Sequence, residues 1–248
     1  MTIYILWLRQ IKRYLRSKSR IIGSLGQPIL FLFALGFGLG PMYASANAGA
    51  SYISFIAPGV IAMSVLFTSI FSGIEMIWDR QFGFLKETFV APVPRISVMF
   101  GRTLGGATVA TLQGCIVFVI SLVAGFRPES WALIPVAFVI IFLIALTFTA
   151  LGTAFASILE DMQAFQLIMN FLVMPLFFLS GALFPLTNLP MALAILVRLN
   201  PLSYGVDALR YTLLGVAHFP IALSIGVLGV SLIVFLTIGS WLFSRMEL

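Results

Sequence analysis

The chain has 248 residues, of which 61% are hydrophobic and only 9% are charged, whereas a soluble domain typically has about 25% charged residues. Such a chain cannot cover a water-facing surface with polar groups, so we expect an all-α, polytopic membrane protein. The net charge is +6, but the cations gather in short clusters beside apolar runs, which argues against nucleic acid as a partner. The single cysteine, Cys115, excludes an intramolecular disulfide and a cysteine-based metal cluster.

Residues 1–20 are predicted to form a helix that lies in the membrane interface. On a helical wheel, the apolar and aromatic side chains of this segment fall within about 120° of one another: Trp7, Leu8, Ile11, Tyr14 and Leu15. The cations occupy the opposite face: Arg9, Lys12, Arg13, Arg16 and Arg20. Two such faces are typical of an interfacial helix. The alternative, a cytosolic tail whose charges only fix the topology, is compatible with this prediction.

Six apolar windows have about the 20 residues that a spanning helix needs: 21–41, 53–74, 98–125, 131–158, 162–183 and 220–243. Residues 44–46 resemble a signal cleavage site, but the preceding apolar run exceeds the roughly 7–15 residues of a signal peptide, so we predict a retained span. Six spans place both termini on one side. If that side is cytoplasmic, only Arg127, Arg198 and Arg210 of the 14 Lys and Arg residues lie outside, as the positive-inside rule requires.

Residues 184–219, between the fifth and sixth predicted spans, have an irregular composition. The segment contains three prolines, two asparagines, one aspartate and two arginines, and its apolar run 191–197 is too short to cross a membrane. We predict two short helices, broken near Asn200–Pro201, that dip into the outer leaflet as a re-entrant segment. Such backbone is tolerated at depth only where protein or water covers it. An ordinary extracellular loop is the alternative.

The sequence predicts no catalytic residue, no metal site and no bound cofactor. Every acidic residue lies at a span end or in a connection, which gives little support to ion-coupled transport: Glu75, Asp79, Glu87, Glu129, Glu160, Asp161, Asp207 and Glu247. One histidine, His218, cannot supply a zinc site, and we expect it to be an interfacial polar group. No phosphate-binding loop is present. If ATP drives this protein, another polypeptide must therefore bind the ATP.

Residues 75–96 concentrate charge, aromatic rings and proline between the second and third predicted spans. Phe82, Leu85 and Phe89 recur at spacings of three and four, which predicts a short amphipathic helix. Pro92 ends that helix, because proline removes a hydrogen-bond donor and restricts the residue before it. A short helix of this kind is suited to docking in a partner's groove. From residue types alone, a solvated loop with topological charges remains open.

Three stretches resemble the ABC-2 type transporter permeases, and in particular the drug-resistance and nodulation-factor export group. They are "WDRQFGFLKETFVAPVPR" (78–95), "FFLSGALFPLTNLP" (177–190) and "LNPLSYGVDALR" (199–210). The resemblance covers essentially the whole chain, 1–248, as a single transmembrane domain. Gln81 stands where members of the family often have glutamate, so a charge-dependent contact at this position is in doubt.

The resemblance implies that residues 75–96 are the coupling loop that inserts into a separate ATPase subunit, which would hold ATP and Mg. The residues that carry this role would be Asp79, Arg80, Gly83, Phe84, Leu85, Lys86 and Glu87. It also implies a second permease copy, as a homodimer, in the inner or plasma membrane. The Glu160–Asp161 connection is a second candidate contact, although a solvated turn is the favoured interpretation there.

An outer gate and a substrate path complete the predicted machinery. The gate would consist of Asn200, Tyr204, Asp207 and Arg210. Asp207 and Arg210 are three residues apart and could pair on one helix face, either in the gate or only to secure the fold. The path would be lined by Phe67, Phe71, Phe171, Phe177 and Phe178, although these rings could equally face lipid or pack between helices.

The expected function is export of an amphipathic or lipid-like substrate, such as a drug, a lipid or a glycolipid, powered by the partner ATPase. Two alternatives remain from the sequence. The first is a gradient-driven carrier or channel, and the second is a membrane scaffold that transports nothing.

Overall fold

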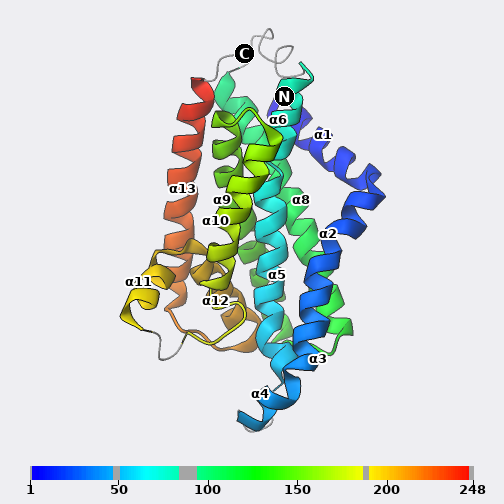
Figure 1. Cartoon of the computed structure of the whole chain (residues 1–248), viewed down its shortest axis with the longest axis vertical. Coiled ribbons are helices and arrows are strands. Elements are labelled where there is room, and N and C mark those ends of the chain that lie inside the picture. The colour runs from blue at the N-terminus through cyan, green and yellow to red at the C-terminus, as the bar shows by residue number, and fades with distance from the viewer. Residues whose placement is uncertain (1, 47–50, 84–93, 187–189, 246–248) are drawn as a thin grey trace.

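The computed structural model describes residues 2–46, 51–83, 94–186 and 190–245, and all the regular structure in these residues is helical (Figure 1). The elements are α1 (Thr2–Arg16), α2 (Lys18–Leu30), the π-helix η1 (Phe31–Leu35), α3 (Gly36–Gly38), α4 (Gly40–Ala46), α5 (Tyr52–Phe71), α6 (Ile74–Gln81), α8 (Arg95–Val123), the 3₁₀-helix η2 (Trp131–Leu133), α9 (Ile134–Ile158), α10 (Met162–Phe178), α11 (Met191–Leu199), α12 (Pro201–Leu214) and α13 (Ile221–Ser244). The expected all-α fold is thus confirmed for these residues.

Five helical stretches among the described residues are long and apolar enough to cross a membrane: Lys18–Gly38, Tyr52–Gln81, Arg95–Val123, Trp131–Ile158 and Ile221–Ser244. They match five of the six predicted spans. Their apolar windows exceed the roughly 20 residues that a bilayer requires. In Figure 1 these helices run side by side along the long axis of the molecule, and α1 and the end of α13 lie at the same end of it.

The predicted span over 162–183 is a shorter helix, α10, which has 17 residues. It ends at Phe178, shortly after Pro175, and Gly181 then has a positive φ of 74°. Because only glycine adopts this conformation without strain, the chain turns there and does not extend the helix. Helix α10 still buries one side, since Phe165 and Val173, two helical turns apart, contact the bundle.

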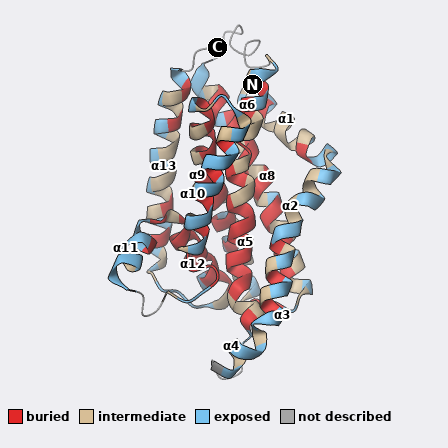
Figure 2. Ribbon diagram, viewed as in Figure 1, coloured by how far each residue is buried: buried red, intermediate tan, exposed pale blue. Residues whose placement is uncertain are grey.

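Helices α11 and α12 meet at an angle of 81°, with the break at Asn200 where the sequence places it. Pro201 occupies the first position of α12, where its missing N–H costs nothing. Residues 202–210 are all buried, so α12 is enclosed on every side at the end of the bundle opposite α1 (Figure 2). A bent pair of this kind could count as a sixth span, and its re-entrant position in a membrane stays a prediction.

Helix α5 forms the centre of the bundle, and all of its residues from 56 to 66 are buried (Figure 2). Glycines allow its neighbours to approach closely. A Cβ added to Gly59 would lie 2.3 Å from the carbonyl oxygen of Ala182, and one added to Gly152 of α9 would lie 2.5 Å from that of Ile70. Small residues at such crossings let helix backbones pack in the van der Waals contact that holds membrane bundles together.

The first spanning helix is irregular. Pro28 lies inside α2, which ends at Leu30. Residues 31–35 then form a π-helical turn, and α3 continues the helix. Proline removes a backbone hydrogen bond within a helix, and a π turn accommodates one extra residue. This helix is also loosely attached, since only 17% of its most apolar window is buried, compared with 72% for Tyr52–Gln81.

Candidate functional site

The charged end of the molecule is organised around the buried carboxylate of Asp79, at the end of α6. Arg9 of α1 donates two hydrogen bonds of 2.9 Å to it, one to each oxygen. Arg102 of α8 donates a third, of 2.6 Å, and Arg13 lies 3.8 Å away. Asp79 is 6% exposed and Arg102 is 3% exposed. The carboxylate therefore joins three helices from three parts of the sequence.

The end of α6 is also tied to the connection between α9 and α10. Arg80 donates a 2.7 Å hydrogen bond to the carboxylate of Glu160, and Gln81 donates one of 3.1 Å to its backbone carbonyl. Asp161 caps α10 by accepting a 2.8 Å bond from the amide of Ala164. The two connections predicted on the same side thus contact each other, and Asp161 has a structural task.

Phe82 and Gly83 are the last described residues before the gap at 84–93. Gly83 has a φ of 81°, which favours glycine, so the chain turns sharply after α6. The Phe82 ring is 75% exposed and lies 5.7 Å from the ring of Trp78. Four predicted coupling residues lie outside the described residues: Phe84, Leu85, Lys86 and Glu87.

Helix α1 lies across α8 and is held there by two polar contacts. The indole of Trp7 donates to the Thr108 hydroxyl at 2.9 Å, and the Tyr14 hydroxyl donates to the Gln113 side-chain oxygen at 2.6 Å. Tyr14 is 3% exposed. Burial raises the pKa of its phenol, and the nearby charge of Arg20 opposes this with a smaller effect. The raised pKa keeps the hydroxyl protonated, so it can donate the hydrogen bond.

The wheel for 1–20 grouped Tyr14 with Leu15, but the structure separates them. Leu15 is 58% exposed, whereas Leu6, which the wheel did not select, is buried. The helix also ends at Arg16, and Arg20 belongs to α2, where it pairs with Glu75.

Replacing Tyr14 with phenylalanine is expected to destabilise the protein by about 1–3 kcal/mol, because Gln113 would lose its partner in a buried site. The amide nitrogen of Gln113 already has no hydrogen-bond partner among the described residues. Thermal unfolding of the purified protein in detergent measures this effect. Tyr4→Phe on the same helix is the control, since Tyr4 is 60% exposed and should be neutral. An equal shift in both variants would contradict the role of the Tyr14 hydroxyl.

At the opposite end, two predicted gate residues hold the bend between α11 and α12. The Asn200 side chain accepts a 3.0 Å hydrogen bond from the Leu202 amide and donates one of 2.7 Å to the carbonyl of Leu176 in α10. The Tyr204 hydroxyl donates to the carbonyl of Arg198 at 3.0 Å. Both side chains thus bind backbone groups that have no hydrogen-bond partner within a helix, because they lie at the bend or at the end of α10.

The other two gate residues bind separate backbone segments. Asp207 accepts 2.8 Å hydrogen bonds from the amides of His218 and Phe219, and Arg210 donates one of 2.9 Å to the carbonyl of Gly181. In the part of the chain that the structure describes, no direct ion pair joins Asp207 to Arg210. The spacing of three residues therefore does not produce the pair that it permits.

The five predicted path phenylalanines do not meet in one cavity. Phe67 and Phe71 stack at 6.2 Å and line a cleft of about 230 Å³ between α2 and α5. Phe177 is fully buried, 5.9 Å from Phe31. Phe171 is 84% exposed and lines a different groove, of about 260 Å³, at the end of α10. Phe178 is 43% exposed.

Three residues of the charged end around Asp79 were not among the residues predicted to carry the coupling role: Arg9, Arg102 and Glu75. Glu160 was named only as part of a second candidate contact. Arg102 carried a usable signal, because an arginine within an apolar window is costly unless it faces a partner inside the bundle. No feature of the sequence identified its partner as Asp79, since the two residues meet only when α6 and α8 pack.

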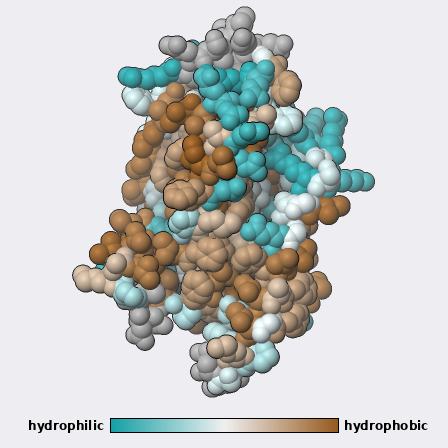
Figure 3. Space-filling model, in the orientation of Figure 1, coloured by the Kyte–Doolittle hydropathy of each residue, from teal (hydrophilic) through white to brown (hydrophobic). Residues whose placement is uncertain are grey.

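The described residues form a helical bundle in which α1 packs across α8, a charged connection follows Tyr52–Gln81 and a bent helix pair precedes α13, with hydrophilic surface gathered around α1 and α6 (Figure 3). Together with the five long apolar helices, this arrangement is that of a multi-pass membrane protein. Residues 1–214 match the family model described as ABC-2 type transporter, and the chain belongs to that family.

Several proteins are similar to this chain over most of its length. Nodulation protein J of Rhizobium leguminosarum bv. viciae is 30% identical over 92% of this chain and 90% of its own length. The inner membrane transport permease YadH of Escherichia coli K12 is 29% identical, over 93% and 90%. A putative transport permease, ycf38 of Cyanophora paradoxa, is 28% identical over 84% and 73%.

Proposed function

We propose that this protein is the membrane-spanning permease subunit of an ATP-binding cassette exporter, powered by a separate ATPase subunit that holds ATP and Mg. Membership of the ABC-2 family supports a transport permease. The sequence contains no phosphate-binding loop, which supports a separate chain as the one that would hold ATP. On this proposal the chain itself catalyses no reaction.

The observation that carries the proposal is the way the end of α6 is held. Asp79 fixes it to α1 and α8, and Arg80 fixes it to the turn before α10. A force applied to residues 84–93, which follow directly in the sequence, would pass through α6 to α1, to α8 and to the turn between α9 and α10. We propose that the motor binds Gly83, Phe84, Leu85, Lys86 and Glu87, with Arg80 at the base of the loop and Asp79 as its internal anchor.

The location proposed for the protein is the inner or plasma membrane, with both termini cytoplasmic. Eleven of its 14 cationic residues would then lie inside, which is the bias expected at the cytoplasmic surface. The printed description of YadH as an inner membrane transport permease supports the same location.

A second copy of the chain would complete the translocation path. The windows in Lys18–Gly38 and Ile221–Ser244 are only 17% and 11% buried within one chain, so apolar faces remain that a homodimer could cover. An amphipathic or lipid-like substrate suits the phenylalanines at 67, 71, 171 and 178, which keep access to the surface. On this proposal Asn200, Tyr204, Asp207 and Arg210 keep the outer end closed by holding α12 in place.

Co-purification from native membranes in mild detergent tests the motor contact. We expect an ATPase to accompany the wild-type chain and to be lost from the Gly83→Pro/Glu87→Arg variant, because proline cannot adopt the φ of 81°. Gly125→Pro/Glu129→Arg is the matched control. It has the same spacing, and Gly125 also has a positive φ, of 104°, at the other end of the bundle.

Loss of the ATPase from both variants, or from neither, would contradict the coupling site. Transport that continues without an ATPase but needs an ion gradient would favour the carrier. An ATPase that binds while vesicles show no transport would favour the scaffold.

A further inference from the structure

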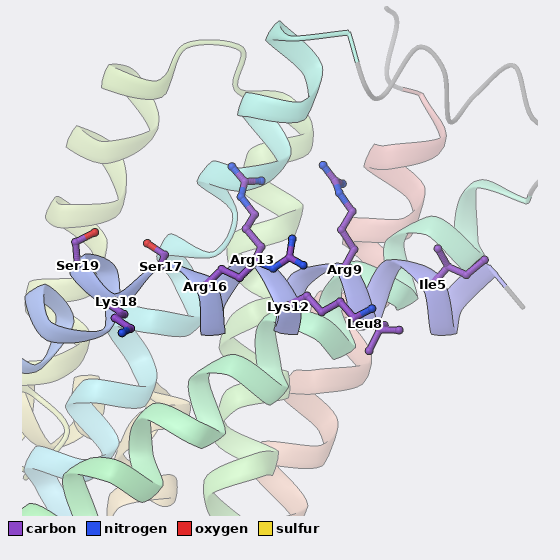
Figure 4. A pocket seen from close by; sticks show the side chains of 9 residues that line it. All are labelled: Ile5, Leu8, Arg9, Lys12, Arg13, Arg16, Ser17, Lys18 and Ser19. Atoms are coloured by element: carbon purple, nitrogen blue, oxygen red, sulfur yellow. The ribbon is translucent and has the colours of Figure 1, made fainter.

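An open groove of about 940 Å³ lies along α1 and the start of α2, at the charged end of the bundle. Figure 4 shows the side chains that line it. They come from residues 5–19, and cations predominate among them. Arg9 and Arg13 line this groove and also contact Asp79, whereas none of the predicted gate or path residues lines it.

The positive charge of this groove is neutralised only in part by the rest of the described chain. Residues 2–20 contain six cations and no carboxylate. The carboxylate of Asp79 accepts hydrogen bonds from Arg9 and lies near Arg13. The carboxylate of Glu75 accepts a hydrogen bond from Arg20. The other three cations are exposed and, within the described ranges, form no ion pair: Lys12, Arg16 and Lys18.

The two groups of cations point in different directions. In Figure 4, Arg9 and Arg13 extend from α1 toward α6, where Asp79 lies. Lys12 and Lys18 extend from the other side of the chain, and Leu8 extends to that same side. Lys12 and Lys18 therefore share an edge with an apolar side chain. A lysine stem covers apolar surface while its ammonium reaches the polar boundary of a membrane.

The bend between α1 and α2 adds a hydrogen-bond donor. Ser17 lines the groove and precedes α2, but its side chain makes no capping hydrogen bond. Ser17, Lys12, Lys18 and Arg16 all line the groove, with the Ser17 hydroxyl on the side of Arg9 and Arg13 (Figure 4). Phosphate oxygens are the acceptors that such a set of charged donors binds well.

We propose that this groove binds the phosphate headgroup of an anionic phospholipid, with an acyl chain against the Leu8 side of α1. The proposal rests on the cytoplasmic orientation given above, because the cytoplasmic leaflet supplies anionic lipids and attracts basic segments at its surface. The lipid is a bound ligand of the permease, distinct from the exported substrate. A surface that only fixed topology would need the charges but no groove.

The test is native mass spectrometry of the full chain, delipidated in detergent and titrated with phosphatidylglycerol or with phosphatidylcholine of the same acyl chains. We expect tighter binding of phosphatidylglycerol. In Lys12→Gln/Lys18→Gln this binding should weaken by about 25-fold, at about fivefold for each cation lost, with no change for phosphatidylcholine. Lys12→Arg/Lys18→Arg should retain the affinity.

Arg127→Gln/Arg198→Gln removes the same charge at the other end of the bundle and should leave phosphatidylglycerol binding unchanged. Equal affinity in the wild type and in Lys12→Gln/Lys18→Gln would overturn the proposal and leave the cations a topological role alone. Displacement of the lipid by millimolar inorganic phosphate would also overturn it, in favour of a free phosphate ligand. None of these readouts uses the ATPase, so failure here and failure of motor coupling are distinguishable.

Discussion

Asp79→Asn is expected to lower the stability of the folded protein by about 3–5 kcal/mol, because Arg102 would then be a buried guanidinium without a counter-charge. Arg102 is only 3% exposed, so water cannot hydrate its guanidinium, and its counter-charge is the carboxylate of Asp79. An asparagine can still accept one hydrogen bond, but it cannot neutralise the guanidinium. Detergent-solubilised variants compared by thermal unfolding and by yield of monodisperse protein measure the loss.

Two further variants separate the buried charge from general damage at this end. Glu160→Gln removes the pair with Arg80, but Glu160 is 76% exposed, and such a pair contributes only about 0–1 kcal/mol. Asp79→Leu/Arg102→Met replaces both buried charges with apolar groups and should recover much of the lost stability. Arg9 would remain, but its side chain is 35% exposed and can be hydrated. A double variant as unstable as Asp79→Asn would contradict this account.

Gly152→Ala is expected to destabilise the bundle by about 1–3 kcal/mol. This is opposite to the usual effect, because alanine inside a helix is normally more stable than glycine by about 0.5–1 kcal/mol. The new Cβ would lie 2.5 Å from the carbonyl oxygen and 2.8 Å from the Cα of Ile70. Both are backbone atoms, so no rotamer change can relieve the contact. Helices α5 and α9 would have to separate, and unfolding temperature reports the result.

Gly229→Ala in α13 is the matched control for the glycine effect. Nothing lies within 4 Å of a Cβ added at Gly229, so the variant should be neutral or slightly stabilised through helix propensity. A similar loss in both variants would show that the α5–α9 crossing does not require glycine. Neither glycine belongs to the proposed coupling loop.

The sequence predicts the spans well because each one is decided by local composition. Windows of apolar residues, bounded by charges or by residues that favour turns, locate α5, α8, α9 and α13 to within a few residues. Helix α10 is the exception. Its apolar window continues to Leu183, and the helix stops earlier because Gly181 adopts a positive φ that composition does not encode.

The interior of the charged end could not be predicted in the same way. Asp79 reads as an exposed loop charge, since it follows Trp78 at the end of a span. Its burial depends on Arg9 and Arg102, which are 70 residues before it and 23 residues after it in the chain. The same holds for Asp207 and Arg210. Their spacing favours a mutual pair, but Asp207 instead accepts hydrogen bonds from two backbone amides and Arg210 donates one to a backbone carbonyl elsewhere in the fold.

The contacts of α1 impose an order on the biogenesis of this protein. Trp7 and Tyr14 bind partners on α8 that are 101 and 99 residues further along the chain. At a synthesis rate of roughly 5–20 residues per second, α1 leaves the ribosome about 5–20 s before those partners exist. Asp79, which is 70 residues after Arg9, is made before these partners on α8. The hydrogen bonds by which Trp7 and Tyr14 hold α1 in the folded protein therefore form only after the helix that supplies their partners, α8, has been made.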